Sequence, residues 1–268
     1  MKYMSLNTHS WMEEEPMEKL RATAELIMAQ EIDVIALQEV NQLKKSELAE
    51  LDNQFCPLST HEFPVRQDNY ALLLVTYLKE QGYHYYWSYT CSHIGYDIYE
   101  EGSAILSKQK FRAESLLVSP MNDMNDYHTR QILLAHLDQL TVGSCHFSWW
   151  EEDVKSGFYY EWQQLLEMTR KISHQVILLG DFNSPAHASK GGYDLVTESF
   201  FDVYHLAEEK MGEHTVEMAI DGWADNTEKL RIDFGFVSQK VKVESYQVVF
   251  NDVIGPVVSD HYGVLIEM

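Results

Sequence analysis

The sequence has few cysteines and no long apolar segment. Its 268 residues contain three cysteines, Cys56, Cys91 and Cys145. An odd number at wide spacing fits neither a disulfide framework nor a zinc ribbon. The longest apolar run, from Tyr70 to Tyr77, is far below the ~20 residues that a membrane span needs. Since Met1–Asn7 also has no apolar stretch typical of a signal peptide, we expect a cytoplasmic protein without a membrane partner.

Positive charge is scarce as well. Lysine and arginine number 20 against 42 aspartates and glutamates, which gives a formal net charge of −22. Nucleic-acid-binding proteins usually carry a basic surface, so this charge argues against nucleic acid as a partner. An acidic nuclease can still carry a locally basic groove, so nucleic acid is disfavoured as a partner and stays among the alternatives.

Repeats, low-complexity segments and Gly/Ser/Pro-rich linkers are absent, which predicts one domain over residues 1–268. Short apolar or alternating runs predict strands at Lys2–Asn7, Asp33–Leu37, Tyr83–Thr90, Ser103–Leu106, Ala113–Val118, Gln131–Leu137, Thr141–His146, Val176–Leu179, Ile232–Val237, Val241–Val249 and Tyr262–Glu267. Helices are predicted at Glu13–Gln30, Asn69–Gln81, Phe158–Ile172, Ser189–Thr197 and Val203–Lys210. This order predicts a four-layer α/β sandwich, in which two packed, mostly antiparallel or mixed sheets are flanked by helices.

Polar motifs gather at the ends of the predicted strands, where open sheets present ligands. They are Asn7, Gln38-Glu39, His146, Gly180-Asp181-Phe182-Asn183, Arg231-Ile232-Asp233 and Ser259-Asp260-His261. Each motif alone fits a turn or a satisfied core residue. Asp233 is harder to dismiss, because a carboxylate in an apolar strand needs a partner. The occurrence of all six together indicates a site.

The residue types in this set share one chemistry. Glu39 with a nearby Asp or Asn supplies the hard oxygen ligands that Mg²⁺ prefers, and no thiol or multi-histidine cluster favours zinc. An Asp–His pair stabilises a cationic imidazole beside a phosphate, and another Asp can activate a water. The set therefore indicates metal-assisted attack of water on phosphorus.

The ordered motifs Leu6-Asn7, Gln38-Glu39, Gly102-Ser103-Ala104-Ile105-Leu106-Ser107, Cys145-His146, Gly180-Asp181-Phe182-Asn183, Arg231-Ile232-Asp233 and Ser259-Asp260-His261 resemble the endonuclease/exonuclease/phosphatase superfamily. The resemblance runs from the first predicted strand to the last. It implies a four-layer αββα sandwich and dependence on Mg²⁺ or Mn²⁺. It further implies that Glu39 is the main metal ligand, that Asn7 touches the metal or orients Asp181, and that Asp260 holds a second metal or completes the first ligand set.

The same resemblance implies the catalytic roles. Asp181 orients or deprotonates the attacking water, and Asn183 and His146 donate hydrogen bonds to the phosphoryl oxygens as charge builds. His261 contacts the phosphate and is held by Asp233.

The resemblance leaves the role of Arg130 undecided, and the chain departs from the superfamily pattern at Glu100-Glu101. Arg130 either reaches a phosphate or forms a surface ion pair. DNA-repair members of the superfamily tend to carry a Tyr just before the Gly-x-Ala-Ile-Leu-Ser-like segment, where this chain has Glu100-Glu101. Two carboxylates there would repel a DNA backbone, which argues against nuclease activity.

Tryptophans occur in loops that follow or precede the motifs: Trp11 after Asn7, Trp149 and Trp150 after His146, and Trp223 in Asp221-Gly222-Trp223. They either form a platform for a sugar ring or a base, or cap the core. The opening Leu6-Asn7-Thr8-His9-Ser10-Trp11 is similar to sugar-phosphate phosphatases of the maltose 6′-phosphate phosphatase type, which implies a phosphorylated disaccharide as substrate. The alternatives are a metal-dependent nuclease or other phosphodiesterase on the same scaffold, and a non-catalytic binding module.

Overall fold

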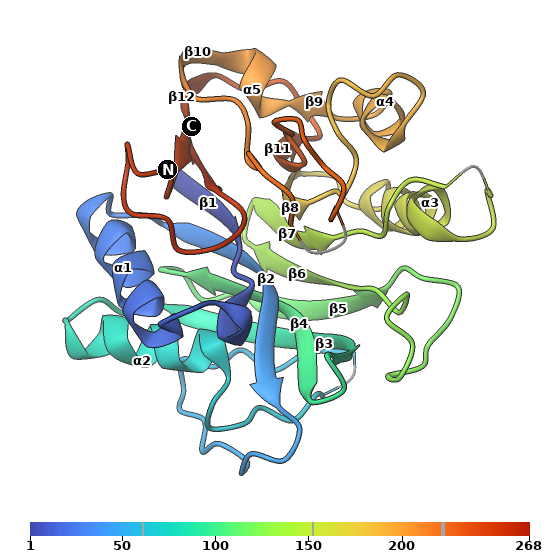
Figure 1. Cartoon of the computed structure of the whole chain (residues 1–268). Helices are drawn as coiled ribbons and strands as arrows, with labels where there is room; N and C mark the ends of the chain where they lie inside the picture. Colours follow the sequence, from blue (N-terminus) through green and yellow to red (C-terminus); the bar gives the residue numbers. More distant parts are fainter. Residues whose placement is uncertain (61, 152, 221–222) are drawn as a thin grey trace.

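The chain forms two β-sheets that stack face to face (Figure 1). The structure is a computed structural model that describes residues 1–60, 62–151, 153–220 and 223–268. In the described residues, one sheet has seven strands in the order β10 (Ala207–Met211), β12 (Val243–Val249), β13 (Gly263–Glu267), β1 (Lys2–Asn7), β2 (Val34–Leu43), β4 (Tyr99–Ser107) and β3 (Tyr86–Gly95). The other has six, in the order β5 (Arg112–Leu117), β6 (Gln131–Leu137), β7 (Leu140–His146), β8 (Gln175–Asp181), β11 (Asp233–Val237) and β9 (Phe201–Asp202).

Both sheets are mixed. In the seven-stranded sheet, β1 pairs parallel with β2 and antiparallel with β13. In the six-stranded sheet, β7 pairs parallel with β8, whereas β11 is antiparallel to β8. Parallel pairing places the carboxyl ends of β1 and β2 at one edge, and those of β7 and β8 at one edge of the second sheet.

Helices cover the outer faces of both sheets. The helical segments of the described chain are η1 (Ser10–Met12), α1 (Pro16–Ala29), α2 (Tyr70–Glu80), α3 (Gly157–Thr169), α4 (Gly192–Thr197) and α5 (Val203–Leu206). Pro16 begins α1 at a position where its missing N–H costs nothing. Asn69 caps α2, since its side chain accepts a hydrogen bond from the Leu72 amide.

The layers follow from the alternation of side chains along the strands. In β1, Met4 and Leu6 belong to a core cluster with α1 and α2, whereas Tyr3 belongs to a second cluster between the sheets. A third cluster packs α3 and α4 against the outer face of the six-stranded sheet. Period-two alternation thus gives each sheet two buried faces. The predicted αββα sandwich is confirmed.

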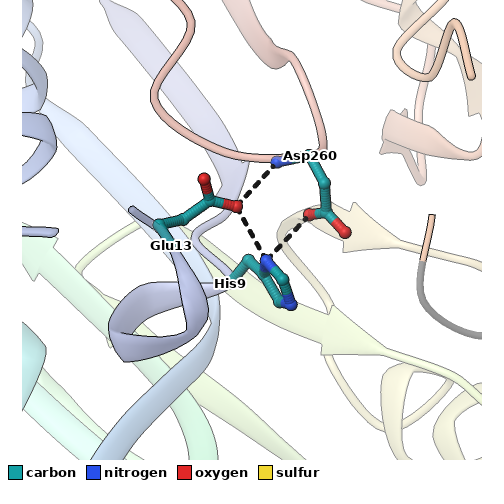
Figure 2. A group of neighbouring side chains, drawn as sticks. All are labelled: His9, Glu13 and Asp260. Carbon is teal, nitrogen blue, oxygen red and sulfur yellow. Dashed lines mark hydrogen bonds and ion pairs between the residues drawn. The ribbon is translucent and has the colours of Figure 1, made fainter. Parts of the chain in front are cut away.

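The first and last parts of the chain meet next to β1. Since β1 lies between β2 and β13, the loop after β1 lies beside the loop before β13. The backbone N–H of Asp260 donates to Glu13 Oε1 at 3.2 Å, and His9 lies against both side chains (Figure 2). Residues 247 positions apart are therefore brought to the same corner of the sandwich.

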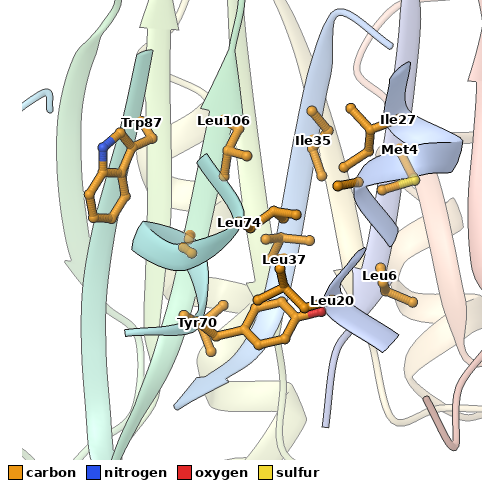
Figure 3. Packing of buried hydrophobic residues seen from close by; sticks show 14 of the residues in the cluster. Met4, Leu6, Leu20, Ile27, Ile35, Leu37, Tyr70, Leu74, Trp87 and Leu106 are labelled. Carbon is orange, nitrogen blue, oxygen red and sulfur yellow. The ribbon is translucent and has the colours of Figure 1, made fainter. Parts of the chain in front are cut away.

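The cluster under α1 and α2 is the largest part of the core on that side. Leu20 and Ile27 of α1 and Leu74 of α2 pack on Ile35 and Leu37 of β2 (Figure 3). The helices present these residues at helical spacing, as their apolar patterns predict. This packing holds β1 and β2 rigidly at the ends that carry Asn7 and Glu39.

One predicted helix is wrong. Val203–Lys210 is helical only over α5, and Ala207–Met211 forms strand β10, which pairs parallel with β12. The helix-favouring Glu208, Glu209 and Lys210 are exposed on an edge strand, where tertiary pairing overrides local propensity. Charged side chains at such an edge also discourage pairing with another chain.

Other predicted elements differ in extent. The strand predicted at Asp33–Leu37 continues to Leu43, and the helix predicted from Ser189 begins at Gly192. Within the part of the chain that is described, none of the helices combines the length and the apolar character that crossing a bilayer demands.

Candidate active site

A bulge in β2 turns Glu39 toward the end of β1. The pairing of β2 with β4 shifts register between Leu37 and Val40, and Glu39 has a left-handed backbone with φ 51°. The Asn7 side-chain amide donates to Glu39 Oε1 at 2.8 Å and to Asp181 Oδ2 at 3.2 Å. Because Asp181 ends β8, this amide joins carboxylates from the two sheets.

The end of β8 is shaped by a close backbone approach. Gly180 has φ 150°, and a Cβ atom there would lie 1.9 Å from the carbonyl oxygen of Cys145. Only glycine fits this position. Beyond it, the Asn183 amide N–H donates to Asp181 Oδ1 at 2.8 Å, and Asn183 Nδ2 donates to the Phe147 carbonyl at 2.9 Å. Both side chains are buried and held in fixed orientations.

Two histidines face the Asp181 carboxylate. His261 Nδ1 lies 2.9 Å from Asp233 Oδ2, so Asp233 has the partner that its burial requires. The Nε2 atoms of His261 and His146 each lie 3.8 Å from Asp181 Oδ2. Burial alone would lower the pKa of His261, but the carboxylates of Asp233 and Asp181 raise it well above its usual value. Burial and the charge of Arg130 lower the pKa of His146 well below its usual value.

Several carboxyl groups lie close together in the buried part of the site. Burial, with the charges of Glu101 and Asp260, raises the pKa of Glu39 to about 8. Burial and the charge of Asp233 raise the pKa of Asp181 to about 7. Asp233 Oδ1 is buried without a hydrogen-bond partner in the described chain. A cluster of carboxylate oxygens such as that of Glu39, Asp181 and Asp233 suits a divalent cation, which would remove the repulsion among these side chains.

Asp260 lies in a neighbouring cluster with His9 and Glu13 (Figure 2). His9 Nδ1 is 2.7 Å from Glu13 Oε1 and 3.7 Å from Asp260 Oδ1. Although burial lowers it, the hydrogen bond to Glu13 and the charges of Asp260 and Glu39 raise the pKa of His9 to about 9. Lys19 also pairs with Glu13. Within the described residues, Asp181, Asp233 and His261 form a second group with the spacing of metal ligands.

A cavity of about 410 Å³ opens over these side chains. It is lined by Glu39, His93, Ile94, Gly95, Tyr96, Asp97, Glu101, Asn125, Tyr127, Arg130, His146, Trp149, Asp181, Asn183 and His261. Of the residues predicted from the sequence, Asn7 and Asp233 lie behind this lining, where they hold Glu39, Asp181 and His261. Asp260 lies beside it.

Arg130 is buried in the cavity wall, so the alternative of a surface ion pair is wrong. Its Nε donates to Ser148 Oγ at 3.3 Å. Ser148 in turn donates from Oγ and from its backbone N–H to the Glu161 carboxylate, at 2.7 and 2.9 Å. Glu161 is a buried residue of α3, and burial raises its pKa, whereas the charge of Arg130 lowers it. Ser148 therefore links the Arg130 guanidinium to the buried carboxylate of Glu161.

The tryptophans take different positions. Trp149 lines the cavity. Trp11 and Trp150 do not: Trp11 packs edge-on against Tyr70 at 5.4 Å, and Trp150 packs against Phe158 at 6.2 Å, so both rings cover the core.

Trp223 is not among the lining residues and packs on a small apolar cluster with Ile220, and its Nε1 donates to Asn183 Oδ1 at 3.0 Å. Its neighbours Asp221 and Gly222 lie outside the described residues.

Only one carboxylate of Glu100-Glu101 faces the site. Successive strand residues point to opposite faces. Glu101 lines the cavity with His93, at 3.3 Å between His93 Nε2 and Glu101 Oε1. Glu100 instead pairs with Arg66, which donates to it from Nε at 2.6 Å.

Sequence reasoning missed the part of the lining that comes from the end of β3, the β3–β4 turn and the segment before β6. These residues are His93, Tyr96, Asp97, Asn125 and Tyr127. They follow no motif, and the run Gly95-Tyr96-Asp97 between two apolar segments was the one available sign of a turn.

Comparisons with known proteins agree with this geometry. The model of the Endonuclease/Exonuclease/phosphatase family matches residues 11–261. A comparison with curated proteins gives no significant match. Among solved structures, an endonuclease/exonuclease/phosphatase family protein from Leptotrichia buccalis C-1013-b is 30% identical, with a TM-score of 0.85 over 100% of this chain and 98% of the other.

More distant structures share the fold. A mannosyl-6-phosphatase from Bacteroides thetaiotaomicron VPI-5482 is 17% identical, with a TM-score of 0.62 over 100% of this chain and 98% of the other. TDP2 from C. elegans is 18% identical, with a TM-score of 0.62 over 100% of this chain and 75% of the other. The family match over most of the sequence and the full-length match at 30% identity show that the chain belongs to the endonuclease/exonuclease/phosphatase family of phosphoric-ester hydrolases.

Proposed function

We propose that the protein is a Mg²⁺-dependent phosphomonoesterase that acts on a cytoplasmic phosphorylated sugar, with maltose 6′-phosphate as the first substrate to test. The observation that carries this proposal is the convergence of Glu39, Asp181 and His261 on one cavity in which Arg130 is the single guanidinium or ammonium cation among the described lining residues. One such cation suits one phosphate group. It does not suit a polyanion, which needs many.

Glu39 and Asp260 are the proposed metal ligands. Their oxygen donors suit Mg²⁺, and Mn²⁺ is expected to substitute for it. Of the two roles implied for Asn7, metal contact or orienting Asp181, its hydrogen bonds to Glu39 and Asp181 favour the second. When bound, the cation neutralises charge on the phosphate and on the carboxylates around it.

The remaining residues act on the water and the phosphate. Asp181, whose pKa of about 7 suits a base at neutral pH, orients the attacking water and takes its proton. Asn183 and His146 donate hydrogen bonds to the phosphoryl oxygens as negative charge develops there. His261, which Asp233 holds at 2.9 Å and favours in its cationic form, donates from Nε2 to the same group.

Arg130 is proposed to bind a phosphate oxygen. Its guanidinium is kept in the wall by Ser148, and its charge is balanced by the buried Glu161. The mannosyl-6-phosphatase among the structural neighbours supports a sugar phosphate as the substrate class.

The test is phosphate release with Mg²⁺ from a panel that contains maltose 6′-phosphate and glucose 6-phosphate, with supercoiled plasmid in parallel. Asp181→Asn serves as the blank, because it keeps the size of the side chain and removes the base, with an expected loss of about 10²–10⁴-fold. We expect rapid release from a sugar phosphate and intact plasmid. Plasmid nicking without phosphate release would instead identify a nuclease or other phosphodiesterase.

A further inference from the structure

The cavity is larger than the group that reacts in it. A volume of about 410 Å³ lies in the range of sites for small organic molecules. Glu39, His146, Asp181, Asn183 and His261 account for one part of its lining. Arg130, proposed above to bind the phosphate, and the His93–Glu101 pair of β3 and β4 add to that part. The rest comes from the β3–β4 turn with the end of β3, from residues 125 and 127 in the segment that leads into β6, and from Trp149.

Five residues of this second part form what we call the hairpin–loop subsite: Tyr96, Asp97, Asn125, Tyr127 and Trp149. Three are aromatic, and the other two carry a carboxylate and an amide. Aromatic faces pack on the apolar C–H faces of sugar rings, and carboxylates and amides pair with hydroxyl groups. In the described lining, this subsite adds a negative charge and no lysine or arginine, so it does not favour a second anionic group.

The two segments are tied to each other. The Ile94 N–H donates to the Met124 carbonyl at 2.6 Å, and His93 Nδ1 lies 3.2 Å from the Thr129 carbonyl oxygen. Within the second segment, Thr129 Oγ1 donates to the Asp123 carbonyl at 2.7 Å. Asn125 and Tyr127 are thus presented by a cross-linked loop, and their positions are set before a ligand arrives.

Tyr127 has an exposed ring that a neighbouring histidine holds in place. Its side chain is 54% exposed, and it packs against the His128 ring with centroids 3.9 Å apart. His128 is in turn fixed by Asp126, whose Oδ1 is 2.7 Å from His128 Nδ1. An aromatic face that is supported from one side and open on the other is suited to stacking.

The turn that carries Tyr96 and Asp97 has a backbone conformation that is unfavourable for residues other than glycine. Both residues have positive φ, 50° and 63°, and the Ile98 N–H donates to the Gly95 carbonyl at 3.2 Å, as in a type I′ hairpin turn. Asn-Gly adopts that turn with the least strain. Strained residues that persist gather at functional sites, and here both side chains reach the cavity lining.

We propose that the hairpin–loop subsite binds the leaving group of the substrate, a neutral polyhydroxylated unit such as the sugar rings beyond the phosphorylated carbon. This inference rests on the proposed phosphomonoesterase function. Of the four tryptophans that the sequence left open between a substrate platform and a cap on the core, the subsite includes Trp149 alone. The residues set substrate specificity and take no part in the reaction itself.

Two variants test the subsite. Tyr127→Ala removes the exposed ring. The double variant Y96N/D97G removes a ring and a carboxylate and gives the turn its preferred sequence, so a loss of folding does not confound the result. Ile98→Ala is the matched control, because Ile98 is exposed on the same turn and does not line the cavity.

The readouts are steady-state hydrolysis of maltose 6′-phosphate and of glycerol 3-phosphate, and inhibition by free maltose. We expect both variants to raise KM for the disaccharide phosphate about tenfold, to weaken inhibition by maltose equally, and to leave glycerol 3-phosphate hydrolysis and kcat unchanged. The control should match the wild type in every assay.

Equal losses on both esters, or unchanged kinetics on both, would overturn the subsite. If the wild type releases phosphate from neither ester but from another phosphomonoester, or if it nicks plasmid, the proposed substrate or function fails first. That outcome is visible before any variant is made.

Discussion

The side-chain amide of Asn183 is held on both sides. Its Nδ2 donates to the Phe147 carbonyl, and its Oδ1 accepts from Trp223 Nε1 at 3.0 Å. The second contact fixes which way the amide points in a residue that lines the cavity. Trp223 thereby serves as a positioning residue for Asn183.

Trp223→Phe should lower kcat about fivefold with little change in KM. The variant keeps most of the packing and removes one N–H donor, and one hydrogen bond contributes about 1 kcal/mol. Steady-state kinetics on the substrate that the panel identifies checks this. Trp150→Phe is the control, because Trp150 packs on Phe158, and it should keep the wild-type rate. A rise in KM alone for Trp223→Phe would contradict the positioning role.

For single residues, the sequence predicts which side chains belong to the site better than it predicts which side chains contact one another. A carboxylate in an apolar strand needs a partner, which singled out Asp233, and the resemblance to the superfamily implied that this partner is His261. The Trp223–Asn183 bond was not predicted, since 40 residues separate the two and only tertiary packing brings them together. The same holds for Arg130 and Glu161, which lie on a strand start and a helix.

Among the elements, α3 contributes a buried acid to the site. Glu161 is in the first turns of the helix and faces inward beside Trp162 and Leu165 of the third core cluster. Its two oxygens accept from the Ser148 N–H and Oγ. The helix therefore fixes the segment after β7 and, through it, Arg130.

Glu161→Gln should weaken phosphate binding and lower stability. The change keeps the shape but removes the charge that balances Arg130, and a hydrogen bond to a charged group contributes about 1.5–3 kcal/mol. We expect Tm to fall by about 4–10 °C and the inhibition constant for inorganic phosphate to rise about tenfold. Thermal unfolding and product inhibition measure both.

Glu167→Gln on the same helix is the matched control. Glu167 is exposed and pairs only with Lys171 among its described neighbours, so neither quantity should change. Loss of stability in Glu161→Gln with unaltered phosphate inhibition would show that the acid supports the fold and does not position Arg130.

Most elements were predictable from periodicity, because each sheet is buried on both faces and its strands are apolar. The failures share a cause. The segment Ala207–Met211 is polar enough to suit a helix and is a strand only because β12 lies beside it. The bulge at Glu39 and the turn at Tyr96-Asp97 depend on register and backbone strain, which a hydrophobic pattern does not encode.

For the whole molecule, the site is a junction between the two sheets. Glu39 belongs to the seven-stranded sheet, Asp181 and Asp233 to the six-stranded one, and Asn7 bridges Glu39 and Asp181. The Asn7 amide holds the carboxylates of Glu39 and Asp181 next to each other, and each of them is also repelled by a carboxylate of its own sheet, Glu39 by Glu101 and Asp181 by Asp233.

The metal-free protein should lose stability as the pH rises from about 5 to 8. The pKa values of Asp181 and Glu39 are raised to about 7 and about 8 in the folded chain, from usual values of 3.8 and 4.5. The unfolded chain therefore releases these protons first, and the free energy of unfolding falls over this range. A cation that binds the ionised carboxylates reverses the loss.

Thermal unfolding in EDTA and in Mg²⁺ at pH 5.5 and pH 8 measures this effect. The stabilisation by Mg²⁺ should be larger at pH 8 and reach about 5–10 °C when the cation is at about a hundred times its Kd. Glu39→Gln should raise the Tm of the metal-free protein at pH 8 and abolish the response to Mg²⁺. That variant also separates a specific site from general screening of the net charge of −22, which it barely alters. A Mg²⁺ shift that is equal at both pH values, or that survives Glu39→Gln, would mean that the cation does not bind between the sheets at Glu39.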